Sequence, residues 1–340
     1  MFDKLSKRVT LQDIAVAANS NKCAVSRTLN NHPLAASIRQ ETRERILAAA
    51  ERLGYRPRHH YGSDAAHATI ALVVDLIDYP RSEVLNRVTT GILTEAALHG
   101  ALVQMYPWAD TENALDNILR HHISRLVVLS YDRRLRLLCA RFCRDNGLEA
   151  VFCQEEPCLG FPSVNTDNLA AGAMAAEWLH AEGHVRVGLV GGDPRLYLYA
   201  RDRHEGFMAA AKRLGMAVDR RFTVLSEHPE PLSLKWTDSP LRRQLPTAFF
   251  VFGDNEAILL QTILTNHNVR VPEEVAILSC GDLFLGRVLT PPLKSLNMRF
   301  EDTGRCAVRI LLHAHTPGAK VKDGVYLLAP RPPASAARGK

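Results

Sequence analysis

Long apolar runs are missing from this chain of 340 residues. No stretch reaches the roughly 20 consecutive apolar residues that a membrane-spanning helix needs. The first residues, MFDKLSKRVTLQD, carry charges where a signal peptide would have an apolar segment. We therefore expect no membrane partner, no secretion and a cytoplasmic location.

Paired cysteines are missing too. The chain has an odd number of cysteines and no C-x-x-C pair; they are Cys23, Cys139, Cys143, Cys153, Cys158, Cys280 and Cys306. This usage is typical of reduced thiols inside a cell. Cys139 and Cys143 share a predicted helix face, where buried thiols are favoured over a metal site. His121 and His122 have no partner at zinc spacing, so no metal is expected.

The common catalytic motifs are also absent. There is no G-x-S-x-G, no H-E-x-x-H and no phosphate-binding P-loop. The glycine-rich GLVGGD at 188–193 lacks the G-x-G-x-x-G spacing, which favours a plain strand-to-helix turn over a dinucleotide site. Nothing in the sequence indicates an enzyme, and no cofactor is expected.

Positive charge, by contrast, is concentrated at one end. The net charge is +6, and residues 1–60 hold eleven Lys or Arg against five Asp or Glu, which accounts for all of it. A basic module on a neutral body indicates a polyanionic partner, although a solvated basic surface is the alternative.

The pattern of residues 10–54 predicts three short helices. Thr10 and Asp13 have the spacing of a capping box at the start of the first, which would run over about 11–18. Asn19 tolerates the left-handed backbone of a tight turn, and Ser20 or Asn21 could cap a second helix reaching about residue 29. Two helices joined by so tight a turn make a helix-turn-helix unit.

At this point the sequence resembles a known family. The segment VTLQDIAVAANSNKCAVSRTLNN, followed by ETRERILAAAERLGYRP, resembles the DNA-binding headpiece of the lactose-repressor (LacI/GalR) family. The positions that match the family pattern are Val9, Thr10, Asp13, Ile14, Ala15, Ala18, Val25, Ser26, Arg27, Leu29, Asn30, Thr42, Arg43, Ile46, Leu53, Gly54, Tyr55 and Pro57. The resemblance implies double-stranded DNA as a partner and, for the location, the bacterial nucleoid.

By this resemblance, the second helix lies in the major groove, where Lys22, Cys23 and Arg27 would meet base edges. Cys23 offers little hydrogen bonding, so contact with a thymine methyl group and simple packing remain equal alternatives. Four further residues would contact phosphates and fix the register: Thr10, Asn21, Ser26 and Asn30.

Two departures from the family pattern concern the turn and the linker. The usual Gly-Val-Ser turn is replaced by residues 19–21, Asn-Ser-Asn. Residues 58–69 contain no Leu, Ile or Met, so the family's leucine wedge for the minor groove is missing. We expect a flexible tether there; the alternative is that Tyr61 replaces the leucine as the wedge.

The body alternates short apolar strands with helices, which predicts doubly wound parallel sheets. It resembles the family's effector core, which is similar to periplasmic sugar-binding proteins and has two α/β lobes that the chain joins by three crossings. The expected fold is therefore α + α/β. The expected parts are a headpiece over 1–58, a linker over 59–68, a core over 69–330 and a flexible tail over 331–340. Within the core, the N-lobe would span about 69–164 and 295–328, and the C-lobe about 165–294.

Ligands of such sheets bind beyond the carboxyl ends of the strands. The candidate effector contacts are Asp78, Tyr79 and Arg81 after the first strand, Trp108 after the second, and Arg203, Asp254 and Asp282 in the C-lobe. Packing in the core is an equal alternative for Trp108, and a surface salt bridge is the weaker alternative for Arg203. Asp167 is expected to cap a helix rather than to bind ligand.

The pocket sequence also departs from the family. Gly253 stands where the family has Asn, Gly281 stands where it has an acid, and Arg81 is gained. One acid lost and one Arg gained suggest an effector more anionic than a simple sugar, such as a phosphosugar or a sugar acid.

The sequence thus predicts a transcription regulator, specifically a repressor, that binds a palindromic operator as a homodimer and senses a carbohydrate-related effector. Two rivals remain. The core could serve only as a dimerisation platform, or the chain could be a periplasmic-type solute-binding protein, against which the headpiece argues.

Overall fold

The computed structural model describes residues 10–29, 38–53, 68–75, 82–108, 113–226 and 243–333. They belong to two compact units, Met1–Ala68 and Thr69–Lys340. Several sequence predictions lie outside the described residues: those on Asn30, Asp78, Tyr79, Arg81, residues 59–67 of the linker and residues 334–340 of the tail. In the described ranges, no helix combines the length and the apolar character that crossing a bilayer requires.

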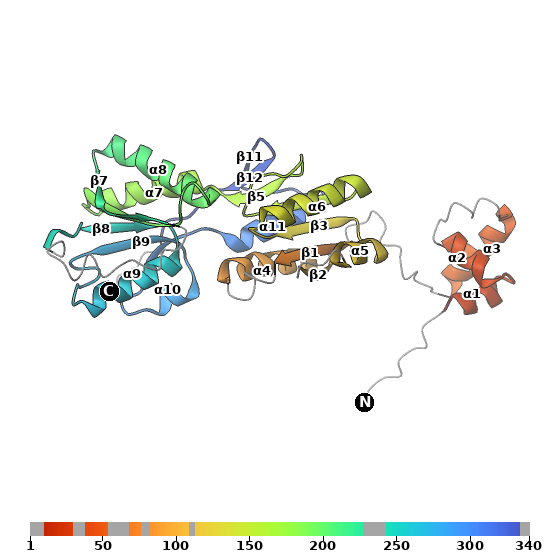
Figure 1. Cartoon of the computed structure of the whole chain (residues 1–340). Helices are drawn as coiled ribbons and strands as arrows, with labels where there is room; N and C mark the ends of the chain where they lie inside the picture. The colour runs from red at the N-terminus through yellow and green to blue at the C-terminus, as the bar shows by residue number, and fades with distance from the viewer. Residues whose placement is uncertain are drawn as a thin grey trace, which may run out of the picture. The chain divides into compact units, whose positions relative to one another are not determined.

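The first unit contains α1 (Leu11–Ala17), α2 (Lys22–Leu29) and α3 (Gln40–Arg52) (Figure 1). The predicted capping box is confirmed, because the Thr10 hydroxyl accepts from the Asp13 N–H and the Asp13 carboxylate accepts from the Thr10 N–H. Asn19 has φ 46°, the left-handed conformation expected of the turn. Asn21 caps α2, since its side-chain oxygen accepts from the Ala24 N–H at 2.8 Å.

Small and branched apolar residues form the core of this unit. Ile14, Val25 and Ile46 are fully buried, one from each helix, and alanines of the three helices fill the space between them. Small side chains let the helices approach closely, so a core this small can hold three short helices that would be unstable alone.

The second unit begins with a sheet in the order β11-β12-β5-β4-β3-β1-β2. Its strands are β1 (Thr69–Asp75), β2 (Leu102–Trp108), β3 (Arg125–Leu129), β4 (Glu149–Cys153), β5 (Ser163–Thr166), β11 (Ala319–Lys322) and β12 (Val325–Leu328). All pairs are parallel except β11 with β12. The helices of this lobe are α4 (Glu83–Leu98), α5 (Asn113–Arg120), α6 (Arg133–Asn146) and α11 (Phe300–Leu311).

The other lobe has a parallel sheet in the order β10-β9-β8-β6-β7. Its strands are β6 (Arg186–Gly191), β7 (Ala217–Leu225), β8 (Ala248–Val251), β9 (Ala276–Gly281) and β10 (Lys294–Asn297). Its helices are α7 (Asn168–Ala181), α8 (Leu198–Leu214), α9 (Asp254–Asn266) and α10 (Phe284–Val288). β6, β8 and β9 are almost entirely buried, as strands of a helix-covered parallel sheet are. The predicted fold class, a helical headpiece with a two-lobed α/β core, is therefore confirmed.

The predicted boundary between the lobes at residue 295 needs a small correction. Residues 294–297 form β10, whose Leu296 lies beside Cys280 of β9, so the chain returns to the first lobe only after Asn297. The earlier crossing lies between β5 and α7, where Asp167 caps α7 as predicted, accepting from the Ala170 N–H at 2.8 Å. After β12, Arg331 exchanges two backbone hydrogen bonds with Asn297, at 2.9 and 3.0 Å, so this first residue of the predicted tail is paired.

Glycines bring α7 and α8 into direct backbone contact. A Cβ atom on Gly172 would lie 2.1 Å from the Arg203 carbonyl oxygen, and one on Gly206 would lie 2.0 Å from the Leu169 carbonyl oxygen. The two helices can pack this closely only because neither position has a side chain. The contact fixes the part of α8 that carries Arg203.

Candidate functional site

One face of α2 is available to a partner of the first unit. Ala24, Val25 and Leu29 point into the core, whereas Lys22, Cys23 and Arg27 are exposed and Ser26 is half-buried. Cys23 and Arg27 are four residues apart, so they lie on the same face of the helix. This exposed face contains the three residues that the sequence predicts to meet base edges.

Two predicted phosphate contacts also have local structural roles. Thr10 begins α1 through its capping box, and Asn21 begins α2 through its cap, while both remain exposed. Helix N-termini present unpaired N–H groups and a partial positive charge to an anion. Their positions are therefore compatible with phosphate contact, which stays a prediction.

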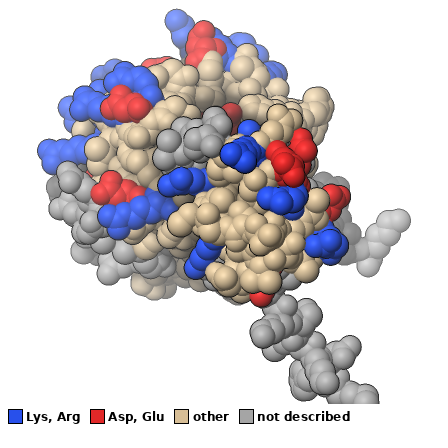
Figure 2. Space-filling model, turned by 90° about the vertical axis from the view of Figure 1, so that its right-hand side faces the viewer, with Lys and Arg blue, Asp and Glu red and all other residues tan. Residues whose placement is uncertain are grey.

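Charge alone does not locate the interface. Figure 2 shows Lys and Arg side chains in separate groups over the face seen there, several of them next to acidic side chains. The helix-turn-helix geometry and the exposed face of α2, rather than one continuous basic surface, indicate contact with DNA.

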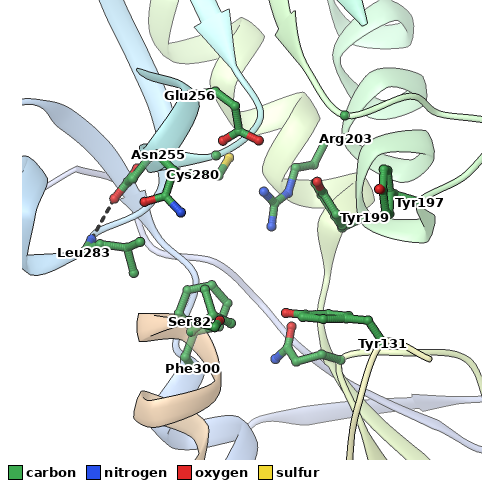
Figure 3. Close-up of a pocket in the computed structure, with 15 residues that line it drawn as sticks. Ser82, Tyr131, Tyr197, Tyr199, Arg203, Asn255, Glu256, Cys280, Leu283 and Phe300 are labelled. Atoms are coloured by element: carbon green, nitrogen blue, oxygen red, sulfur yellow. Dashed lines mark hydrogen bonds between the residues drawn. The ribbon is translucent and has the colours of Figure 1, made fainter. Parts of the chain in front are cut away.

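The second unit contains a pocket of about 450 Å³. It is lined from the first lobe by Ser82, Val84, Tyr131, Gln154 and Phe300, and from the other by Gly192, Tyr197, Tyr199, Arg203, Gly253, Asp254, Asn255, Glu256, Cys280 and Leu283 (Figure 3). Many of these residues follow directly on the carboxyl ends of β3, β4, β6, β8 and β9. This is the expected place for a ligand in such sheets, and the volume suits a small molecule.

Arg203, which the sequence predicts as an effector contact, lines this pocket and is only 6% exposed. Its Nε donates to Asn168 Oδ1 at 2.9 Å, and Nη1 donates to the Phe252 carbonyl oxygen. Its Cζ lies 5.0 Å from the centre of the Tyr199 ring, a cation–π contact. These contacts hold the guanidinium in one orientation facing the pocket (Figure 3).

Asp254 also reaches the pocket wall, but its carboxylate is fully engaged within the protein. Oδ1 accepts from the hydroxyls of Ser279 and Ser295, at 2.5 and 2.6 Å, and Oδ2 accepts from the Leu283 N–H at 2.7 Å. The side chain therefore ties the start of α9 to β9 and β10. This arrangement indicates a structural role at the base of the pocket.

Two other predicted contacts lie outside the pocket lining. Trp108 is half-buried against the core of the first lobe, which is the packing alternative. The Asp282 carboxylate accepts from Arg287 at 2.7 and 2.8 Å and from the Asn297 amide at 2.7 Å. Both side chains are held by neighbours that the sequence pattern does not reveal.

Aromatic and acidic residues of the pocket escaped the sequence prediction. Tyr131 comes two residues after β3, Tyr197 directly precedes α8, and Tyr199 is the second residue of α8. The segments that follow each apolar strand in the sequence contain all three. Burial raises the pKa of Tyr199 to about 12, so its hydroxyl stays protonated and can donate a hydrogen bond.

Glu256, the third residue of α9, is the acid that the prediction missed. It is half-buried, and burial raises the pKa of its carboxyl, while the Arg203 charge opposes this rise and Asp254 adds to it. Figure 3 shows the Glu256 carboxylate and the Arg203 guanidinium on one side of the pocket, with Tyr131 and Phe300 on the other. In the described part of the chain, no three potential ligands are grouped to hold a metal ion.

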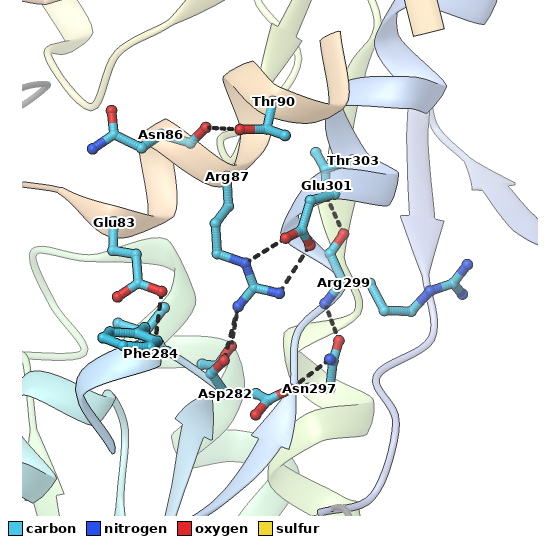
Figure 4. A network of polar contacts seen from close by, with 12 residues as sticks. Glu83, Asn86, Arg87, Thr90, Asp282, Phe284, Asn297, Arg299, Glu301 and Thr303 are labelled. Carbon is cyan, nitrogen blue, oxygen red and sulfur yellow. Dashed lines mark hydrogen bonds and ion pairs between the residues drawn. The ribbon is translucent and has the colours of Figure 1, made fainter. Parts of the chain in front are cut away.

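A polar network joins the two lobes beside the pocket (Figure 4). Arg87 of α4 binds both carboxylate oxygens of Glu301, at 2.7 and 2.8 Å. Its Nη1 also donates to the carbonyl oxygens of Gly281 and Asp282 in the other lobe, at 3.3 and 2.9 Å. Nearby, the Glu83 carboxylate accepts from the Phe284 N–H at 2.8 Å. One arginine therefore bridges a first-lobe acid and second-lobe backbone.

Replacing Arg87 by alanine should lower the free energy of unfolding of the α/β unit by about 1–3 kcal/mol, because charge-assisted hydrogen bonds are lost and Glu301 loses its partner. Arg87→Lys keeps the charge but not the planar guanidinium that binds both Glu301 oxygens, so its free energy of unfolding should fall by about half as much. Urea unfolding followed by circular dichroism measures both. Equal stability of the alanine variant and the wild type would show that the bridge contributes nothing.

Comparison with known proteins agrees with both units. Residues 10–58 match the family described as bacterial regulatory proteins, lacI family, and residues 176–332 match the periplasmic binding protein-like domain. The matches fall on the helix-turn-helix unit and on the part of the core that contains Arg203 and Glu256.

Similar proteins of known function align over nearly the whole chain. The HTH-type transcriptional repressor CytR of Escherichia coli K12 is 27% identical over 334 residues, covering 96% of this chain and 95% of that protein. The repressor PurR of Haemophilus influenzae PittEE is 24% identical over 319 residues, covering 90% and 91%.

Solved structures show the same fold. A lac repressor dimer bound to operator and the anti-inducer ONPF has a TM-score of 0.63 at 22% identity, covering 96% of this chain and 98% of that one. The regulator CelR in complex with cellobiose has a TM-score of 0.62 at 22% identity, covering 95% and 98%. The chain therefore combines a LacI-family DNA-binding domain with a periplasmic-binding-protein-like core, its full-length relatives are repressors, and it is a DNA-binding transcriptional regulator.

Proposed function

We propose that this regulator is a repressor that binds a palindromic operator as a homodimer and senses a small carbohydrate-related molecule in the pocket between its lobes. The observation that carries the DNA-binding part is the exposed face of α2, with Lys22, Cys23 and Arg27 on a helix whose other face is buried. A cytoplasmic location belongs to the same proposal.

The domain boundaries and the contact residues are part of this proposal. Lys22, Cys23 and Arg27 would meet base edges, and Thr10, Asn21, Ser26 and Asn30 would meet phosphates. In the pocket, Arg203 would contact the effector directly, whereas Asp254 would act by shaping the pocket floor. The relatives named as repressors support regulation rather than catalysis.

The dimer is supported by exposed apolar side chains. Phe284, Leu285 and Val288 of α10 are 63%, 57% and 56% exposed, a concentration that a single copy leaves in water. One headpiece makes few contacts, and linking two of them on a palindrome raises the affinity. The lac repressor structure with the same fold is a dimer on its operator.

A sensing role is supported by the pocket itself and by the fold relatives that hold ligands, cellobiose in CelR and D-xylulofuranose in a further regulator. The rival is a core that serves only for dimerisation. A thermal-shift screen of sugars, sugar acids and phosphosugars separates the two, because a bound ligand raises the melting temperature by mass action. We expect one compound class to raise it and to change operator affinity; a protein that binds its operator but responds to no compound would favour the rival.

A further inference from the structure

Gly253 and Glu256 fit together at the pocket wall. A Cβ atom on Gly253 would lie 2.4 Å from the Glu256 Oε2 atom, so a side chain there would displace the carboxylate. A Cβ atom on Gly281 would lie 2.8 Å from the Asp254 carboxylate. The backbone thus leaves room beside Gly253 for Glu256. Although position 281 has no acidic side chain, position 256 supplies one to the pocket.

The Glu256 carboxylate faces the pocket without a competing side chain. Among the described residues, no side chain donates a hydrogen bond to it, although it lines the pocket and is half-buried. Arg203, on the same side, has its Nε and Nη1 occupied by Asn168 and Phe252, which leaves Nη2 for a ligand. One acceptor and one donor, each charged, therefore lie together at the pocket wall.

We propose that Glu256 is a specificity-determining residue, which together with Arg203 selects an uncharged ligand that offers a hydroxyl or N–H donor next to an acceptor. This inference rests on the proposed sensing function and names its ligand class. It revises the expectation of a phosphosugar or a sugar acid, because that expectation counted an acid as lost from the pocket.

The physical reason is charge balance between a buried arginine and a half-buried glutamate. The opposite charges of Arg203 and Glu256 cancel for a neutral ligand, which can pair with both. A carboxylate or phosphate on the ligand would be attracted by Arg203 but repelled by Glu256, and an anion shielded from water needs full pairing. Tyr131 and Phe300, across the pocket, offer aromatic side chains to the remainder of the ligand.

Isothermal titration calorimetry of the full chain with matched compounds tests this. The set is glucose with glucuronate and glucose 6-phosphate, galactose with galacturonate, ribose with ribose 5-phosphate, and cellobiose. We expect the neutral member of any pair that binds to do so at least tenfold more tightly than its acid. Glu256→Gln should weaken binding of the neutral ligand about tenfold or more, as the loss of a hydrogen bond to a charged group does. It should also reduce the ratio of neutral-ligand affinity to acid affinity.

Two further variants test whether the effect is specific to the Glu256 carboxylate. Gly253→Ala leaves the charge intact but displaces the carboxylate, so it should reproduce the loss seen for Glu256→Gln. Glu273→Gln removes an exposed glutamate of the same lobe and should leave binding unchanged. Melting temperatures without ligand show that each variant is folded.

The outcomes separate this inference from the proposed function. Tighter binding of an acid by the wild type, or an unchanged ratio of neutral to acid binding in Glu256→Gln, would overturn the role of Glu256 while leaving ligand sensing in place. Binding of no compound in the set would count against sensing itself, and with it against the ligand class.

Discussion

Replacing Arg27 by alanine should weaken binding to the operator by about 30-fold or more. Arg27 is exposed on α2, where an arginine can bind a guanine through two hydrogen bonds. Each such pair contributes about 1–3 kcal/mol of discrimination, and a dimer on a palindrome loses two of them. Fluorescence anisotropy with labelled operator at about 150 mM salt measures the loss, since affinities at other ionic strengths are not comparable.

The matched control is Arg52→Ala, which removes the same charge from an exposed position at the end of α3. It should weaken binding to operator and to unrelated duplex by a similar small factor, because only the overall charge changes. If Arg27→Ala also weakened binding to both duplexes equally, Arg27 would contact phosphates, and base recognition would have to be assigned to other residues.

Replacing Asp254 by alanine should lower the stability of the α/β unit by about 3–5 kcal/mol. The carboxylate is 1% exposed and accepts from two serine hydroxyls and one backbone N–H. Its removal leaves these three donors unpaired in the interior, and each buried unpaired group costs about 1–3 kcal/mol. Urea unfolding followed by fluorescence measures the change.

Two controls accompany this variant. Asp116→Ala removes an exposed carboxylate on α5 and should change stability by less than about 0.5 kcal/mol. Unfolding of the helix-turn-helix unit should be unaffected by Asp254→Ala, since that unit has its own core. An Asp254→Ala variant of wild-type stability with lost ligand binding would restore Asp254 as a direct contact.

The headpiece could be predicted almost completely because its signals are local. The capping box of Thr10 and Asp13, the left-handed Asn19 and the apolar positions of α1 and α2 all act within a few residues of sequence. Local propensity and packing agree here, which is the condition under which sequence patterns are most informative.

The pocket could be predicted only in part, because its chemistry depends on distant residues. Arg203 was predicted because the segment around it resembles the family's effector core. The role of Asp254 changes because Ser295, 41 residues later, donates to its carboxylate. Glu256 was missed because its place depends on the space beside Gly253, and no periodicity in the sequence records that space.

In-vitro selection from random duplex DNA at about 150 mM salt is the most direct test of sequence-specific DNA recognition by this chain. The full chain should enrich a palindrome, whose half-sites report the α2 face and whose centre shows whether the linker needs a particular sequence there. Retention of DNA without any enriched motif, in the presence and the absence of a ligand, would contradict the claim and reduce the headpiece to a phosphate-binding module.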